Sequence, residues 1–216
     1  LTEENIYVLD SPILTNSQLK KFKRFFSKKT KEIDCTFDIS SSLKDRIEKI
    51  REEAETSVRE GSTCLILSDK NISNKKASIP SILTVGAVHS HLVKLGLRGY
   101  CSLNVECADT LDTHSFAILI GVGATTINPY LAIDSIYHRY EKKLFGKSDF
   151  ESCVVKFKKS IDAGLLKIMS KMGISVVSSY RGGCNFEAVG LSRAIVSDYF
   201  PGMSSRISGI GVIGIE

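Results

Sequence analysis

Residues 79–132 read IPSILTVGAVHSHLVKLGLRGYCSLNVECADTLDTHSFAILIGVGATTINPYLA, and this stretch decides the fold. Pro80 fixes the φ angle that a first helical turn needs, and the apolar residues after it cover nearly every side of the predicted helix. We expect that helix to be buried. Residues 101–106 and 116–121 are predicted strands, the second apolar on both faces, as is typical of a covered parallel sheet.

Helix and strand signals alternate along the rest of the chain. Helices are predicted to begin at Asn16 or Ser17, at Ser41 or Ser42, after the Asn128-Pro129 turn, after Asp149 and at Ser192. Strands are predicted at residues 6–9, 63–68, 174–178 and 186–189, with a possible extended piece at 36–40. This order predicts an α/β fold with mainly parallel strands. Periodicity alone leaves a doubly wound sheet and part of a β/α barrel both open.

Length and composition describe an ordinary globular domain. The chain has 216 residues, of which 43% are hydrophobic and 25% are charged, enough to bury one good core. No apolar run approaches the ~20 residues that span a bilayer, and the first residues lack the pattern of a signal peptide. We therefore expect a cytoplasmic protein without membrane partners.

Cysteine usage argues against a metal centre. The six cysteines are scattered without a Cys-x-x-Cys pair, and several stand in apolar runs, where a reduced thiol behaves as a small hydrophobe. We expect neither a cysteine-bound metal nor an iron–sulfur cluster in this chain.

A basic segment lies near the start. Residues 19–32 hold seven basic side chains and one acidic one, and we expect residues 1–40 to form a peripheral basic segment of the same domain. Phenylalanines at 22, 25 and 26 could stack on the bases of a nucleic acid. A helix with its phenylalanines inward and its lysines in water is the preferred interpretation, so a nucleic-acid partner is not expected.

His89 and His91 suggest a metal site at first sight. Two residues apart on a helix, they point about 200° away from each other and cannot bind one ion together. One of them facing Glu106 or His114 across the sheet would give a zinc-like site, but a polar network is the commoner outcome.

Four polar residues, Asp69, Glu106, His114 and Asn128, fall at the ends of predicted strands, where α/β folds bind ligands. An anion or amide pocket competes here with simple capping of helices and loops, which we prefer. Arg181, in the loop SSYRGGCNFEA, suits an anion or a neighbouring domain equally. The tail GIGVIG has the spacing of a dinucleotide-binding fingerprint, but no apolar strand is expected to lead into it, so we expect no dinucleotide site there.

Several ordered motifs carry a family resemblance. The segments GAVHSHLVKLGLR, NVECA, THSFAILIGVGA, INPYLA, KSIDAGLLKIMSKMGIS, SSYRGGCNFEAVGL and SSRISGIG resemble the central domain of the glutamate synthase large subunit, from about residue 9 to the C-terminus. The resemblance implies a partial, open, TIM-barrel-like β/α unit, with residues 1–216 as the C-terminal two-thirds or more of that domain. Sequence departures include Ser90 and Ser115, where the family tends to show histidine.

The resemblance also implies a function. The domain would be a non-catalytic connector that docks a glutamine amidotransferase domain and an FMN-binding synthase domain and walls part of an ammonia tunnel. It would hold no cofactor itself; FMN and a 3Fe-4S cluster would lie in the neighbouring domain, and a small FAD/NADPH subunit is a further implied partner. Its candidate polar or tunnel-side residues are Asp69, His89, His91, Glu106, His114, Asn128 and Arg181, none of them catalytic.

Two alternatives come from other functional classes. The first is a stand-alone β/α enzyme or phosphate-ligand-binding protein that uses Glu106, His114 and Arg181. The second is a nucleic-acid-binding module that uses residues 20–31. No complete catalytic constellation supports the enzyme, and the connector is therefore preferred.

Overall fold

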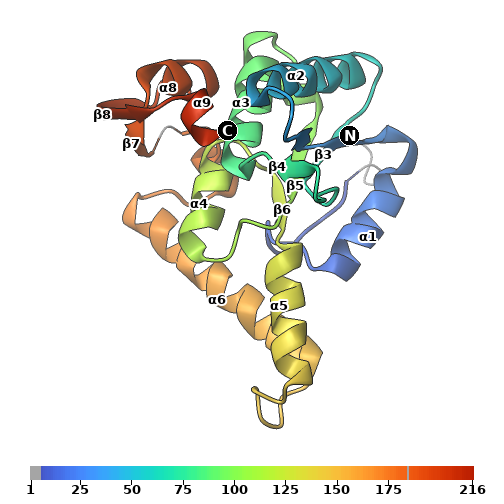
Figure 1. Ribbon diagram of the computed structural model, residues 1–216. Helices are drawn as coiled ribbons and strands as arrows, with labels where there is room; N and C mark the ends of the chain where they lie inside the picture. Colours follow the sequence, from blue (N-terminus) through green and yellow to red (C-terminus); the bar gives the residue numbers. More distant parts are fainter. Residues whose placement is uncertain (1–5, 184) are drawn as a thin grey trace.

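A four-stranded parallel sheet lies at the centre of the molecule. The computed structural model describes residues 6–183 and 185–216 (Figure 1). The sheet has the order β1-β3-β5-β6, with bounds β1 (Thr30–Asp34), β3 (Cys64–Ser68), β5 (Ser102–Glu106) and β6 (Thr126–Asn128). Each strand lies beside the one that follows it along the chain, so this sheet has no switch point. The described residues contain no closed barrel, and the α/β fold is the predicted open β/α unit.

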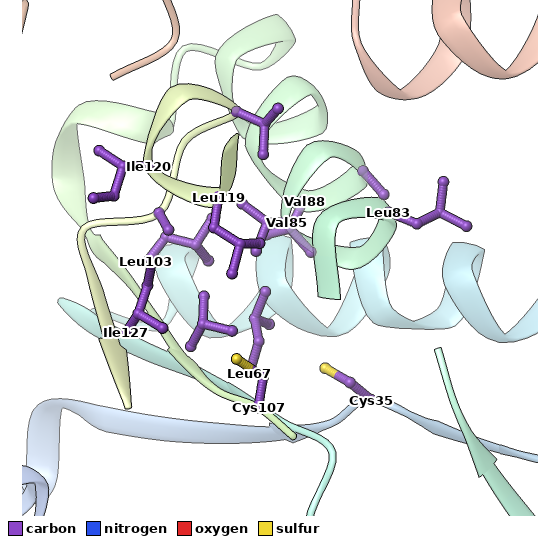
Figure 2. Close-up of a cluster of buried hydrophobic side chains, with 14 of the residues drawn as sticks. Cys35, Leu67, Leu83, Val85, Val88, Leu103, Cys107, Leu119, Ile120 and Ile127 are labelled. Carbon is purple, nitrogen blue, oxygen red and sulfur yellow. The ribbon is translucent and has the colours of Figure 1, made fainter. Parts of the chain in front are cut away.

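Helices between the strands cover one face of this sheet. They are α2 (Leu43–Arg59), α3 (Ser81–Lys94) and α4 (Thr113–Gly121). Helices α5 (Tyr130–Glu141) and α6 (Phe150–Lys171) follow the last strand, and α6 packs against α4 and α5. Ser42 caps α2 and Asp149 caps α6, as predicted, each by accepting a hydrogen bond from a backbone N–H of the first turn. The main core lies between these helices and the sheet. Figure 2 shows it: the labelled strand residues Leu67, Leu103 and Ile127 lie against Val85, Val88 and Leu119 of the helices.

The N-terminal part of the chain covers the opposite face. Helix α1 (Asn16–Phe26) starts in a capping box between Thr15 and Gln18. Its Leu19 and Phe22 pack with Cys64 and Ile66, the β3 side chains that point away from the main core. Just before α1, residues 12–14 run beside β6 and exchange two backbone hydrogen bonds of 2.8 Å with Ile127. Both faces of the sheet are therefore buried.

Smaller elements complete the chain. An antiparallel pair, β2 (Thr36–Asp38) with β4 (Lys76–Ser78), lies near α3, and two short 3₁₀ turns are η2 (Ser27–Lys29) and η3 (Arg98–Tyr100). The C-terminal unit contains α7 (Val177–Tyr180), β7 (Glu187–Leu191), α8 (Arg193–Tyr199), β8 (Ser204–Ile210) and α9 (Val212–Ile215), drawn in orange to red in Figure 1. Strands β7 and β8 form a separate parallel pair. Five of the six cysteines are buried and free, and Cys184 lies outside the described residues.

Three predicted strands are wrong. Residues 116–121 form most of helix α4, which Asp112 caps. This helix is buried and apolar on all sides, so its sequence has no polar face to distinguish it from a covered strand. Residues 174–178 are the loop after α6 and the start of α7, and residues 6–9 have no regular structure. Strands β1, β4, β6 and β8 were not predicted. β8 extends into the first two residues of GIGVIG, and its sequence, SSRISGI, is not an apolar run.

Arg51 of α2 fixes the C-terminal unit to the main body. Its side chain is buried, donates to both carboxylate oxygens and the carbonyl of Asp198 at 3.2–3.5 Å, and donates to the Ala87 carbonyl at 3.3 Å. The guanidinium also lies 4.8 Å from the centre of the Tyr199 ring, within cation–π range. One buried cation therefore joins α2, α3 and α8.

Replacing Gly86 with alanine should destabilise the contact between α3 and α8. A β-carbon at residue 86 would overlap the Phe200 ring and approach the Tyr199 carbonyl oxygen to 2.9 Å. Alanine ordinarily stabilises a helix, but overpacking costs more, and we expect a net loss of about 1–2 kcal/mol in the free energy of unfolding. Urea unfolding measures it. Gly99→Ala is the matched control, because no heavy atom lies within 4 Å of its added β-carbon; equal losses in both variants would contradict this packing.

Candidate functional site

Three of the predicted site residues meet at the carboxyl edge of the sheet. Glu106 ends β5, Asn128 ends β6 and stands opposite Glu106, and Asp69 directly follows β3. All three side chains are buried, with at most 4% of their surface exposed. The parallel register places them side by side, because the strands end at the same edge of the sheet.

Glu106 is the centre of this edge. Its carboxylate pairs with Lys70 at 2.7 Å and with Lys23 at 3.4 Å, and it accepts a hydrogen bond from the Ser68 hydroxyl at 3.0 Å. Burial alone would raise the pKa of Glu106. The hydrogen bond from Lys70 and the charges of both lysines outweigh burial, so the pKa lies below its ordinary value. Glu106 is therefore a stable carboxylate at neutral pH.

Asp69 has a less favourable environment for its charge. The Ala108 N–H donates to Oδ2 at 2.9 Å. Burial raises the pKa of Asp69, and the nearby charge of Asp109 adds to the rise, while the Ala108 N–H and Tyr130 oppose it. Burial of the Tyr130 hydroxyl raises its pKa, and the hydrogen bond to Asp69 and the charge of Asp69 raise it further. The two groups hold each other in place at the start of α5.

Asn128 ties the N-terminal segment to the sheet. Its amide nitrogen donates to the Leu14 carbonyl at 2.8 Å and to Asn16 Oδ1 at 3.0 Å. The side-chain oxygen is buried and has no hydrogen-bond partner in the described part of the chain. The amide therefore holds the start of α1 across the end of β6.

The space at this edge is too small for a substrate. A cavity of about 10 Å³ lies among Asp69, Glu106 and Cys107, about the volume that one water molecule needs. The acidic groups there are bound to lysines, hydroxyls and backbone amides. This arrangement acts as a structural lock between α1, β5 and β6, and it offers no free nucleophile or base.

His89 lies elsewhere, beneath the C-terminal unit. Arg98 donates to its Nδ1 at 3.1 Å, so the neutral ring carries its proton on Nε2. Burial, with the charges of Arg98 and Arg181, lowers the pKa of His89 to about 4. The ring borders a largely apolar pocket of about 160 Å³, also lined by Val93, Val122, Tyr199, Phe200 and Met203.

Arg181 lies near His89, whereas His91 and His114 are separated from this pocket and from each other. His91 pairs with Glu55 at 2.9 Å on the outer side of α3. His114 is exposed in the first turn of α4, so it stands at no strand end, contrary to expectation. Neither His89 nor His91 meets Glu106 or His114. Among residues 6–183 and 185–216, no three His, Cys, Asp or Glu side chains are grouped as a metal ion would require.

The sequence did not predict which lysine and arginine side chains pair with these acidic residues. Lys23 and Lys70 reach Glu106 from distant segments, and nothing in their local sequence indicates it. Arg51 did carry a signal, because it lies on the face of α2 that also carries Ile47 and Ala54, where a charge needs a buried partner.

Comparison with known proteins gives the family. The family model for the glutamate synthase central domain matches residues 2–192. The chain belongs to this family. Similar proteins include the glutamate synthase [NADPH] large chains of Azospirillum brasilense, 51% identical over all of this chain, and of Bacillus subtilis (strain 168), 42% identical over 94% of it. The ferredoxin-dependent glutamate synthase of Pyropia yezoensis is 40% identical over 95% of the chain.

The central domain described here is a small part of such proteins. It spans 14%, 13% and 14% of the three relatives, in the order given. The matches confirm the resemblance inferred from the sequence motifs. No helix in the described part of the domain has the length and apolar character that crossing a bilayer requires.

Replacing Glu106 with glutamine should destabilise the central domain in a pH-dependent way. Because folding lowers the pKa of Glu106, its carboxylate stabilises the fold above the ordinary glutamate range and loses this effect as the pH falls through the folded pKa. We expect Glu106→Gln to cost about 2 kcal/mol at pH 7 and progressively less in acid. Urea unfolding at several pH values measures it.

Glu32→Gln is the control for that experiment. Glu32 pairs with the same Lys23, at 3.0 Å, but 55% of its side chain is exposed, and an exposed pair contributes less than about 1 kcal/mol. A Glu106→Gln loss that equals the control, or that stays constant into acid, would contradict the lock at the sheet edge.

Proposed function

We propose that this central domain is a non-catalytic connector within a glutamate synthase, the enzyme that forms glutamate from glutamine and 2-oxoglutarate. The family membership and the names of the relatives support this proposal. In the parent protein the domain docks a glutamine amidotransferase domain and an FMN-binding synthase domain, and it walls part of the path that carries ammonia between them. Its role belongs to glutamate biosynthesis and nitrogen metabolism, in the cytoplasm.

One observation carries the proposal: the usual ligand-binding edge of the α/β sheet is closed by the domain itself. Helix α1 and residues 12–14 cover this region, Glu106 is held by two lysines, and the remaining cavity is about 10 Å³. An enzyme that worked alone would need that edge open. A domain that acts through its shape does not.

Chemistry in the parent protein is assigned to other parts. We place FMN and a 3Fe-4S cluster in the neighbouring synthase domain, and the domain described here binds neither. The names of the relatives include both NADPH and ferredoxin as electron donors. A small FAD/NADPH subunit would serve as a partner only in a parent of the first kind.

The alternative of a stand-alone enzyme receives no support from the geometry. Glu106 is locked at the sheet edge, His114 is exposed on α4, and Arg181 lies near His89. In the nucleic-acid alternative, the phenylalanines at 22, 25 and 26 would stack on bases. Phe22 is buried against Cys64 and Ile66, and Phe25, which is 44% exposed, packs against Tyr7 and Phe26. The connector role is therefore retained.

Asn128→Ala in the full parent enzyme tests the proposed ammonia path. Removing the amide releases the Leu14 carbonyl and Asn16, so the N-terminal segment should loosen over the sheet edge. We expect glutamine hydrolysis to continue while less glutamate forms per glutamine hydrolysed, because ammonia escapes to solvent. Synthesis from added ammonium should be retained.

The control is Asn71→Ala, in the exposed loop after β3. Both reactions are followed in one assay as glutamine consumed, glutamate formed and free ammonia. A ratio of glutamate to glutamine that equals wild type in Asn128→Ala would contradict a wall role for this edge. A parent protein that makes no glutamate at all would overturn the assignment to glutamate synthase.

A further inference from the structure

The C-terminal sheet exposes an apolar face. Val189 of β7 stands opposite Ile207 of β8, and these two side chains are 64% and 61% exposed. Further along, Leu191 stands opposite Ile210, which is 52% exposed. Helix α8 connects the strands and packs on both of them, with the neighbouring Ala188 buried. The side chains of Val189 and Ile207 are therefore left uncovered in the described part of the chain.

An isolated pair of parallel strands with an exposed face is unusual in proteins. Parallel sheets normally have both faces buried, and two strands alone give little stability. In the described chain β7 and β8 each have one neighbouring strand, so each has an open edge. Six of the seven β8 residues are exposed, from Ser204 to Ile210, with Ser205 partly buried. β8 therefore presents unpaired backbone groups beside exposed isoleucines.

Strand β8 also lacks the usual protection of a free edge. Natural edge strands are often protected by proline, lysine or a covering loop. The β8 sequence SSRISGI has no proline and one charged residue, Arg206, which is paired with Glu187 of β7 at 3.3 Å. The two strands also approach closely, since a β-carbon on Gly209 would overlap the backbone of Gly190. The pairing is irregular, with register shifts between Ala188 and Val189 and between Val189 and Leu191, and in the described chain no strand pairs with the outer edge of β8.

The order of strands in the main sheet indicates how this second sheet is extended. There, each new strand lies beside the preceding one, from β1 through β3 and β5 to β6. The unit β7-α8-β8 repeats the same strand-helix-strand pattern, so a third strand would lie beside β8. The relatives supply the necessary chain, because this domain spans only 13–14% of their length.

We propose that an extended apolar segment of the parent polypeptide, outside residues 1–216, pairs in parallel with the free edge of β8. Its side chains cover the exposed pair Val189 and Ile207. This inference rests on the proposed connector role. It specifies the docking contact: the domain binds its neighbour by sharing a sheet with it. Strand addition provides directional backbone hydrogen bonds, and the exposed apolar face adds burial.

Cross-linking in the full parent enzyme tests the inference. A photoreactive amino acid, benzoylphenylalanine, replaces Ile207 in one variant and Ile72 in a control variant; Ile72 is 47% exposed in the loop after β3. After irradiation, mass spectrometry locates the cross-linked peptides. We expect the probe at residue 207 to join one segment of the same polypeptide outside residues 1–216, and the probe at residue 72 not to join that segment.

Three outcomes would overturn the inference. Cross-links from residue 207 to residues 1–216 of a second copy would make the face a contact between identical chains. Cross-links to another protein would assign it to a different partner. No cross-link from residue 207, as for a free surface, would show that nothing covers β8.

Amide hydrogen exchange on the unmodified parent enzyme is a second test, which does not depend on a photoreactive probe that could disturb folding. We expect the β8 amides that are not bonded to β7 to exchange at least about tenfold more slowly than those of the exposed loop at residues 70–75, because backbone hydrogen bonds to the added strand protect them. Equal exchange rates would overturn strand pairing. Neither readout depends on glutamate synthesis, so a failure of strand pairing is distinguishable from a parent enzyme that lacks synthase activity.

Discussion

The burial of both faces of the central sheet is the constraint on which the rest of the structure depends. On β3, Leu65 and Leu67 point into the core beneath α2 to α4, while Cys64 and Ile66 point to α1. Such a strand is stable only when something covers each side. The N-terminal segment does this on the second face, and in doing so it closes the edge at which α/β proteins commonly bind ligands.

The closed edge gives the polar residues there a structural role. Glu106 and Asn128 look like a ligand site when they are seen only as strand ends. In the folded chain Asn128 holds Leu14 and Asn16 of the segment that closes the sheet. Glu106 binds Lys23 of the same segment at 3.4 Å and Lys70, from the loop after β3, at 2.7 Å. The same chemistry that would recognise an anion or an amide therefore fixes the domain's own N-terminal part.

Local signals in the sequence predicted much of the fold and little of the site. Capping residues and apolar steps gave α2 and α6 correctly, and Pro80 marked the start of α3. Strand β1 escaped notice because TKEID has one apolar residue, and α4 was mistaken for a strand because a fully buried helix has no polar side. The partners of Glu106 and Arg51 come from distant segments, and spacing along the chain carries no information on such pairs.

The central claim is that this domain acts through shape and contacts and has no chemistry of its own. The most direct measurement uses the isolated 216-residue chain, shown to be folded by circular dichroism and supplied with glutamine, 2-oxoglutarate, FMN and a reductant. The account predicts that it retains no flavin after desalting and forms no glutamate. A chain that stays yellow with bound flavin, or that makes glutamate without another domain, would contradict it.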